Sequence, residues 1–412
     1  MDFAITHSKE MEEFRGEVRT WLKENVPDNM RQPIEGADYT LEMHTFWKEK
    51  HKELGVKGWL FPTYPEEYGG GGLTTDHDSI LKEEFHEARV VGFHADGTSL
   101  ATLMVWGSEE QKQKFLVPVL RGEKTIHQKL TEPQSGSDQA NIKVRAVKDG
   151  DDWLITGENV FISTFQDVDM LTGQALTDPD APRHRNTGYF IIDNPSPGMQ
   201  MVPQNLLDTR RDPVAGGLGF QKVVHMENVR VPADHLLGGE TQGWQLMGTV
   251  MEAEHGGEGR AVPRDQAAEN LVKYAGEATR NGTTIWNDPV IQQAIASAVV
   301  DAHINTLFQK RVYWMYQSRI GMSYESNVGN VFNRVKDVAQ SGRARDVMGM
   351  YAHLNGKDPL APHDGFQDIY QRNMAGQRHA GGSTNIAKVI LARRIGISRT
   401  QERAAPTPST AR

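Results

Sequence analysis

Cysteine is missing from all 412 residues of this sequence. Its absence excludes disulfide bonds, thiolate zinc sites and cysteine nucleophiles, and it fits a reducing compartment. Long apolar runs are missing too, because no stretch approaches the roughly 18 residues that a membrane span requires. The first residues, MDFAITHSKEMEEF, are acidic and lack the apolar centre of a signal peptide. We therefore expect a globular, cytoplasmic protein with no membrane segment.

An excess of positive charge is absent as well. The formal net charge is −9 and the basic residues form no stripe, so we expect no nucleic-acid partner. The 15 histidines include no pair at helical metal-ligand spacing beside an acid, so we expect no metal site. The motifs HExxH, GxxxxGK(S/T) and a GxGxxG following a strand are missing, which removes the common metalloprotease, P-loop and dinucleotide-binding signatures.

The residues that are present form an ordinary mixture, 38% hydrophobic and 24% charged. The chain is long enough for two or three units with their own cores. Residues 1–130 have helical periodicity. Near the start, for example, one helical face collects Met11, Phe14, Val18 and Leu22.

After this region the pattern becomes that of strands. In KVRAVKDGDDWLITGENVFIS two β-like runs flank an Asp-Gly turn, which is a strong hairpin signal. Helical periodicity then returns, for example in PVIQQAIASAVVDAHINTLFQKRVYWMY. Helices, strands and helices in this order favour separate domains over an alternating α/β sheet. We predict a helical N-terminal domain (1–130), a middle β domain (131–240), a helical C-terminal domain (241–399) and a disordered polar tail (400–412).

The stretch TEPQSGSD, residues 131–138, carries the most informative chemistry. Gly136 allows a ligand to approach the backbone closely, and Thr131, Ser135 and Ser137 supply hydroxyls and amides for an anionic or heteroaromatic group. Composition alone favours an ordinary turn that leads into a strand. The order of the surrounding motifs favours a ligand loop instead.

In that order the chain resembles the acyl-CoA dehydrogenase family, especially the branch common in bacterial lipid and steroid catabolism. The resemblance covers residues 1–399 and implies a mostly α fold with a central β domain: an N-terminal helical domain, a middle β-barrel and a C-terminal four-helix bundle. The stretches that carry it are MDFAITHSKEMEEFRGEVRTWLKENVP, GWLFPTYPEEYGGGGL, GSEEQKQKFLVPVLRGE, IHQKLTEPQSGSD, GENVFIS, RVPADHLLGGETQGW and GGSTNIAKVILARRIGI.

The resemblance implies α,β-dehydrogenation of an acyl-CoA with FAD. A glutamate removes the α proton, the β hydrogen leaves as hydride to flavin N5, and the electrons pass to an electron-transfer flavoprotein. It also implies a homo-oligomer, tetramer or dimer, or an α2β2 heterotetramer. Two alternatives are a flavin oxidase or monooxygenase on the same fold and a non-catalytic subunit that completes another chain's site. The acyl group is not predictable from this sequence.

The resemblance assigns five cofactor contacts to the stretch IHQKLTEPQSGSD. By resemblance, Gln128, Leu130 and Thr131 lie along the edge of the flavin ring. Gly136 and Ser137 approach its phosphate-bearing chain and the thioester arm, so that Ser137 also binds substrate.

Five further cofactor residues follow along the chain. Phe161 takes the place of an aromatic that packs on the isoalloxazine, although a β-domain core position is the alternative. Ser163 takes that of a hydroxyl donor to N5. Arg280 matches an arginine that reaches the FAD of a neighbouring subunit, with a solvated helix-end residue as the alternative. Ser383 and Asn385 open the last long helix, whose free amides suit cofactor contacts.

The catalytic base is the main departure from the family pattern. Many members carry it immediately before the Gly-Thr or Gly-Ser of the C-terminal signature, where this chain has Gly381. A second family solution matches MEAEHGG and makes Glu254 the base and a substrate contact, with His255 in place of an arginine. Glu252 and Glu258 are nearby acids, and a solvated helix carboxylate is the alternative for Glu254.

Two smaller departures lie near the cofactor loop. Asn159 stands where the family often has lysine, and Gln134-Ser135 where it often has Gly-Ala. The missing lysine removes one positive charge, and flavin binding is still expected.

Overall fold

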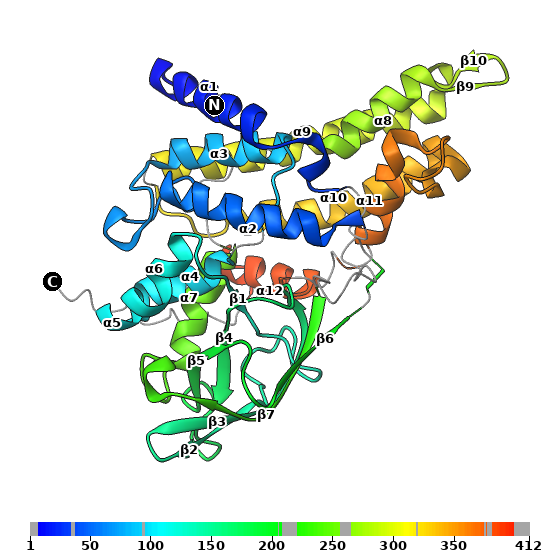
Figure 1. Cartoon of the computed structure of the whole chain (residues 1–412). Coiled ribbons are helices and arrows are strands. Elements are labelled where there is room, and N and C mark those ends of the chain that lie inside the picture. Colours follow the sequence, from blue (N-terminus) through cyan, green and yellow to red (C-terminus); the bar gives the residue numbers. More distant parts are fainter. Residues whose placement is uncertain are drawn as a thin grey trace.

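The computed structural model describes residues 7–33, 38–92, 95–204, 206–207, 221–255, 265–318, 320–374, 376 and 381–398. The tail over 400–412, which was predicted to be disordered, lies outside the described residues. Figure 1 shows helices at one end of the molecule and a β-sheet at the other, with α7 and α12 between them. The chain is thus mostly helical with a central β domain, as the sequence predicts.

The N-terminal helices pack around a core that contains the fully buried Trp47. Ser8 caps the first helix by accepting a hydrogen bond from the backbone of Met11. The predicted apolar face of that helix is confirmed, because Val18 and Leu22 are buried in the same core and Phe14 packs against it. The helices are α1 (Lys9–Asn25), α2 (Leu41–Val56), α3 (Thr75–Glu87), α4 (Gly97–Trp106), α5 (Glu109–Gln111) and α6 (Val117–Leu120), with a π-helical turn over Lys112–Leu116.

The middle strands form one eight-stranded sheet. Its order is β6-β7-β3-β2-β4-β5-β8, and β1 runs parallel to β4. The predicted Asp-Gly hairpin is confirmed, since Asp149 pairs with Asp152 across a turn in which Gly150 has φ +67°. The strands are β1 (Ile126–Gln128), β2 (Arg145–Asp149), β3 (Asp152–Ser163), β4 (Met170–Leu176), β5 (Thr187–Asp193), β6 (Met199–Pro203), β7 (Gln221–Val231) and β8 (Leu236–Leu237).

The C-terminal helices pack mainly through α9 and α10. Asp288 caps α9, and proline occupies its first turn, where no backbone donor is lost. The helices are α7 (Gly243–His255), α8 (Gln266–Glu277), α9 (Pro289–Gln317), α10 (Glu325–Met348), α11 (Phe366–Met374) and α12 (Thr384–Arg394), and a short hairpin of β9 (Thr279–Arg280) and β10 (Thr283–Thr284) follows α8.

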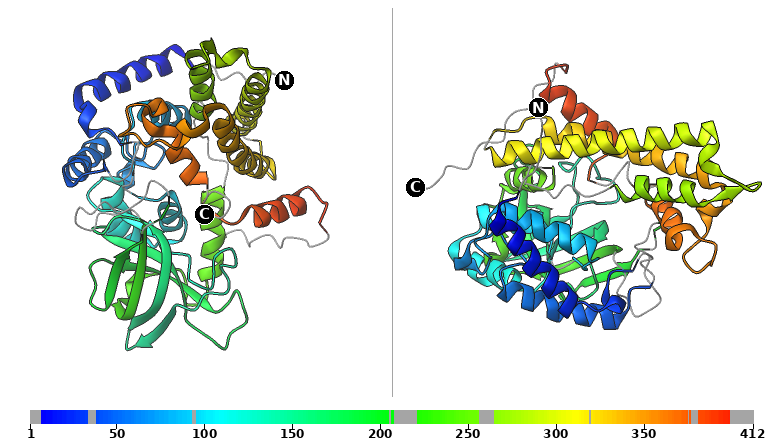
Figure 2. Two further views of the ribbon diagram at one scale, coloured as in Figure 1. Left: turned by 90° about the vertical axis from the view of Figure 1, so that its right-hand side faces the viewer. Right: turned by 90° about the horizontal axis from the view of Figure 1, so that it is seen from above.

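Helix α12 stands out from the rest of the molecule in the left view of Figure 2. None of its residues is buried within the described chain. In the part that the structure describes, no helix has both the length and the hydropathy that crossing a membrane requires.

Candidate functional site

The loop over 131–138 is a tight, self-bonded turn. The backbones of Glu132 and Ser135 exchange two N–H···O bonds of 3.0 Å each, and the Ser135 hydroxyl donates to the carbonyl of Asp138 at 2.5 Å. A Cβ placed on Gly136 would meet no described atom within 4 Å, so this part of the backbone faces open space. A fixed backbone that a ligand can approach is what a cofactor loop requires.

The residues predicted to line the ring edge lie where β1 ends. Gln128 accepts a 2.8 Å hydrogen bond from the Thr98 hydroxyl. Leu130 is partly buried against the core that joins α4 to the sheet. The carbonyl of Thr131 accepts a 2.8 Å bond from the backbone of Val160 in β3. The start of the loop is therefore fastened to β3 next to Phe161.

Phe161 occupies a strained bulge in β3. The pairing of β3 with β7 shifts register between Asn159 and Ile162, and Phe161 has φ +58°. Its backbone donates to Gln204 Oε1 at 3.2 Å, and the residue is 53% exposed. Left-handed backbone at a non-glycine residue costs on the order of 1–3 kcal/mol and concentrates at functional sites. The exposure shows that Phe161 is not a core residue.

Ser163 lies just beyond the bulge, at the end of β3. Gln221 Nε2 donates to its hydroxyl oxygen at 2.8 Å. Ser163 is the acceptor in this bond, so the hydroxyl proton can be donated elsewhere. This geometry suits the predicted donor role.

The C-terminal signature meets the other end of the loop. The backbone N–H of Ser383 donates to Ser137 Oγ at 3.2 Å, which joins residues 246 positions apart. Ser383 also caps α12 by accepting from Ile386. Gly381 (φ +61°) and Gly382 (φ +80°), just before α12, have left-handed backbone conformations, which favour glycine. Asn385 lies exposed in the first turn of the same helix.

Glu254 and Gly381 are neighbours in space. A Cβ on Gly381 would lie 3.1 Å from Glu254 Oε1 and 3.4 Å from Arg334 Nη2. The two positions at which the family places its base therefore converge, and the missing side chain at 381 leaves room for Glu254. The side chain of His255 and all of Glu258 lie outside the described features, and Glu252 is exposed.

Arg334, in α10, also lies at this position. We call the cluster of Glu254, Arg334 and Gly381 the Glu254 corner. The guanidinium of Arg334 donates to the carbonyls of Gly381, at 3.1 Å, and Gly382. Burial lowers the pKa of Arg334, and the charge of Glu254 opposes that effect. Sequence reasoning did not find Arg334, because it belongs to an amphipathic helix 80 residues after Glu254 and to no motif.

Arg280 lies apart from this site. It is exposed, on the β9–β10 hairpin at the far end of α8 (Figure 1), whereas α12 begins next to Ser137 of the cofactor loop. Within one chain the structure does not bring Arg280 to Ser137 or Ser383, an arrangement that a residue serving a neighbouring chain and a solvated helix-end residue would share.

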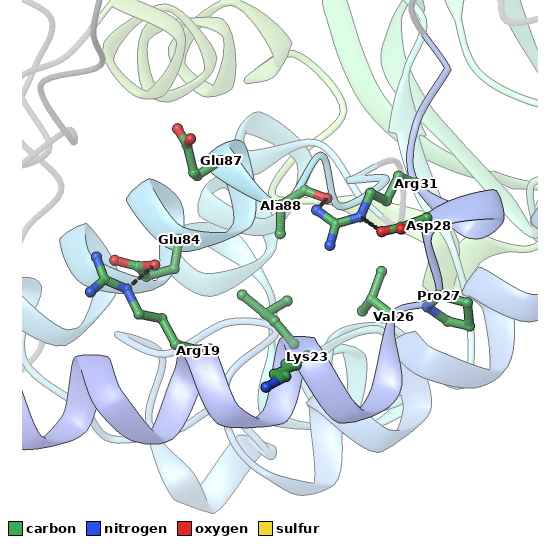
Figure 3. Close-up of a pocket in the computed structure, with 10 residues that line it drawn as sticks. Arg19, Lys23, Val26, Pro27, Asp28, Arg31, Glu84, Glu87 and Ala88 are labelled. Atoms are coloured by element: carbon green, nitrogen blue, oxygen red, sulfur yellow. Dashed lines mark hydrogen bonds and ion pairs between the residues drawn. The ribbon is translucent and has the colours of Figure 1, made fainter.

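A separate hollow of about 480 Å³ lies between α1 and the end of α3 (Figure 3). Four of its charges are paired with one another, Arg19 with Glu84 at 2.8 Å and Arg31 with Asp28 at 3.0 Å. None of the predicted site residues lines it, and the described residues contain no group of three or more His, Asp or Glu side chains that could hold a metal. The hollow therefore adds nothing to the site.

Known proteins match the chain over almost its whole length. Family profiles for the N-terminal, middle and C-terminal domains of acyl-CoA dehydrogenase match residues 8–123, 128–223 and 241–396. Acyl-CoA dehydrogenase FadE29 of Mycobacterium tuberculosis is 28% identical over 75% of this chain and 77% of its own length. IpdE1 of the same organism is 25% identical over 94% and 97%. The ChsE4–ChsE5 complex from M. tuberculosis superposes with a TM-score of 0.79 at 21% identity, covering 96% of this chain and 100% of that chain.

Proposed function

The chain belongs to the acyl-CoA dehydrogenase family of FAD-dependent oxidoreductases, and we propose that it dehydrogenates an acyl-CoA thioester at its α,β bond with Glu254 as the base. One observation supports this choice of base above all. Glu254 lies against Gly381, so α7 delivers a carboxylate to the place where a side chain at 381 would stand.

The proposed role of Glu254 is to accept the α proton. Arg334 would position the carboxylate, because its guanidinium is anchored to the carbonyls of residues 381 and 382. An ionised carboxylate is the state that a general base needs. FAD, when bound, supplies the acceptor for the β hydride.

The residues that would hold FAD surround the loop over 131–138. The exposed aromatic at the strained bulge, Phe161, supports this fit, because a flat ring system could cover it. In this proposal Ser163 donates to the flavin, and Ser137 meets both cofactor and thioester. The other proposed FAD contacts are Gln128, Leu130, Thr131, Gly136, Ser383 and Asn385.

The exposed apolar residues of the C-terminal helices support an oligomer. Ile386 and Val389 in α12 are 39% and 42% exposed, and Val300 and Leu307 in α9 are each 54% exposed. We propose a homotetramer or homodimer in the cytoplasm, in which Arg280 reaches the FAD of a second chain. An electron-transfer flavoprotein would take the electrons.

A second candidate is a non-catalytic subunit of a heterotetramer. The ChsE4–ChsE5 complex, which shares this fold, supports it. A chain with this role should be colourless and inactive when expressed alone, and should gain FAD and activity with its partner.

Anaerobic titration with a panel of acyl-CoAs tests the proposal. We expect the purified protein to carry FAD and at least one acyl-CoA to bleach it. Bound FAD that no acyl-CoA reduces would contradict the proposed reaction. Steady turnover with oxygen and no other acceptor would identify an oxidase.

A further inference from the structure

Lys129 is a fully buried cation that directly precedes the cofactor loop. It is 1% exposed, and its Nζ has no hydrogen-bond partner among the described residues. Buried charges in native proteins are normally paired, because transfer out of water is costly. Burial lowers the pKa of Lys129 to about 8, so most of the amine is still charged at neutral pH. Its surroundings must therefore contain a compensating charge.

The backbone at Lys129 is tightly fixed. Its N–H donates to the carbonyl of Thr172 in β4 at 2.6 Å. A Cβ on Gly173 would lie 2.2 Å from the carbonyl of Lys129, so β4 packs directly on this residue. Gln128 and Leu130, the residues proposed for the ring edge, flank it. Side chains alternate along an extended segment, so we expect Lys129 to point to the side opposite Gln128 and Leu130.

Glu132 is a second buried charge, of opposite sign, three residues further along the chain. It is 3% exposed, and its carboxylate accepts the backbone N–H groups of Lys143 at 2.6 Å and Val144 at 3.1 Å. The side-chain amide of Gln134 is a third donor. The negative charge of Glu132 acts on Lys129 and opposes the effect of burial on the lysine pKa. Two opposite charges are thus buried beneath one turn.

Asn159 reaches the same stretch from β3. It is 1% exposed, and its Nδ2 lies 3.5 Å from the carbonyl of Leu130 and 3.3 Å from that of Thr131. Its Oδ1 has no hydrogen-bond partner in the described chain. A cationic side chain at 159 would start beside the carbonyl of Thr131, the residue directly before Glu132. Position 159, in β3, is therefore a second place from which a positive charge can be introduced next to the turn.

We propose that Lys129 is the internal counter-ion of the cofactor loop, a positioning residue that neutralises Glu132 and so fixes the turn over 131–138. The proposal rests on the proposed function only in treating this turn as the FAD loop. Lys129 acts through Glu132 and does not touch the cofactor. Without the lysine, Glu132 would be a buried carboxylate with no cation, and the turn would open to hydrate it.

Full-length variants test this role through FAD affinity. Lys129→Met removes the charge at similar length and should weaken FAD binding at least about tenfold. Lys129→Met/Asn159→Lys returns a cation from β3 and should restore the affinity to within about threefold of wild type, as coupled sites do. Asn159→Lys alone places two cations beside one carboxylate and should itself weaken binding.

Urea unfolding gives a readout that needs no FAD. Glu132→Gln should lower the unfolding midpoint at pH 7, because it leaves the buried cation alone. The midpoint of the Lys129→Met/Glu132→Gln double variant should differ from the sum of the two single changes, because the second substitution removes a charge that has already lost its partner. Lys148→Met is the matched control: this lysine of β2 pairs with Glu240 at the surface, with 54% and 50% of the side chains exposed, and its loss should change neither readout.

Three results would overturn the proposal. Midpoint changes that simply add in the double variant would show that Lys129 and Glu132 are not coupled. Coupling without any loss of FAD affinity would remove the positioning role. A rescue variant that binds FAD no better than Lys129→Met would show that the charge is not what matters. If wild-type protein binds no FAD, the proposed function fails, and the unfolding cycle still decides whether the two charges are paired.

Discussion

The cofactor loop and the corner around Glu254 are built in opposite ways. The loop over 131–138 closes on itself through hydrogen bonds between near neighbours, and buried Glu132 ties it to the start of β2. The corner joins three distant segments, since Glu254 comes from α7, Arg334 from α10 and Gly381 from the approach to α12. A local structure of the first kind can be identified from a short motif. An assembled structure of the second kind depends on tertiary packing.

Replacing the proposed base should give the largest difference between the two regions, because flavin reduction should slow while FAD binding stays the same. We expect Glu254→Gln to slow flavin reduction by about 10³-fold, within the range that a positioned general base supplies. FAD binding should be unchanged, because glutamine keeps the size of the side chain and Glu254 is not among the proposed FAD contacts. Anaerobic stopped-flow measurement of flavin absorbance gives the rate.

Glu252→Gln is the matched control for this change. Glu252 lies two positions earlier on α7 and is exposed, so its loss should leave reduction within about twofold of wild type. Near-wild-type reduction by Glu254→Gln would remove Glu254 as the base. A large loss in the Glu252 variant would move the assignment to that residue.

The next largest effect is expected from replacing Arg334. Arg334→Gln removes the guanidinium that anchors residues 381 and 382 and faces Glu254, and we expect reduction to slow by roughly 10- to 100-fold. The pH–rate profile should also change, because the charges of Arg334 and Glu254 act on each other. The profile is measured as the reduction rate from pH 5 to 9.

Arg334→Lys separates charge from geometry. Lysine keeps the charge but loses the planar fork that reaches two carbonyls, so the pH profile should be restored more fully than the rate. A slower rate with an unchanged pH profile in Arg334→Gln would mean that the arginine only supports the backbone.

These two regions also mark how far the sequence alone leads. The order of helical, strand and helical regions, the apolar face of α1 and the β2–β3 hairpin follow from local patterns, and the structure confirms them. Glu254 and Gly381 were each singled out, but their contact could not be predicted, because it depends on how α7 packs against the approach to α12. Arg334 and Lys129 left no signal, since an arginine in a helix and a lysine beside a motif look like surface residues until burial is known.

On the loop side, the pH dependence of stability tests the buried lysine. Folding lowers the pKa of Lys129 to about 8, whereas an unfolded lysine titrates near 10.4. Between these values the unfolded chain binds more protons, so the free energy of unfolding rises with pH. Wild type should gain about 3 kcal/mol relative to Lys129→Met from pH 8 to 10.4. Urea unfolding across this window measures the difference, and parallel curves would contradict the burial of a charged amine.

Ser163 should give the smallest effect, because it sits where the loop region borders the reaction. One neutral hydrogen bond contributes about 0.5–1.5 kcal/mol, so Ser163→Ala should slow flavin reduction roughly two- to tenfold. FAD affinity should fall less, since the remaining contacts stay. The matched control is Ser196→Ala, whose hydroxyl bonds only the carbonyl of Asp193 among the described residues. An unchanged rate in Ser163→Ala would contradict the donor role of this hydroxyl in flavin reduction.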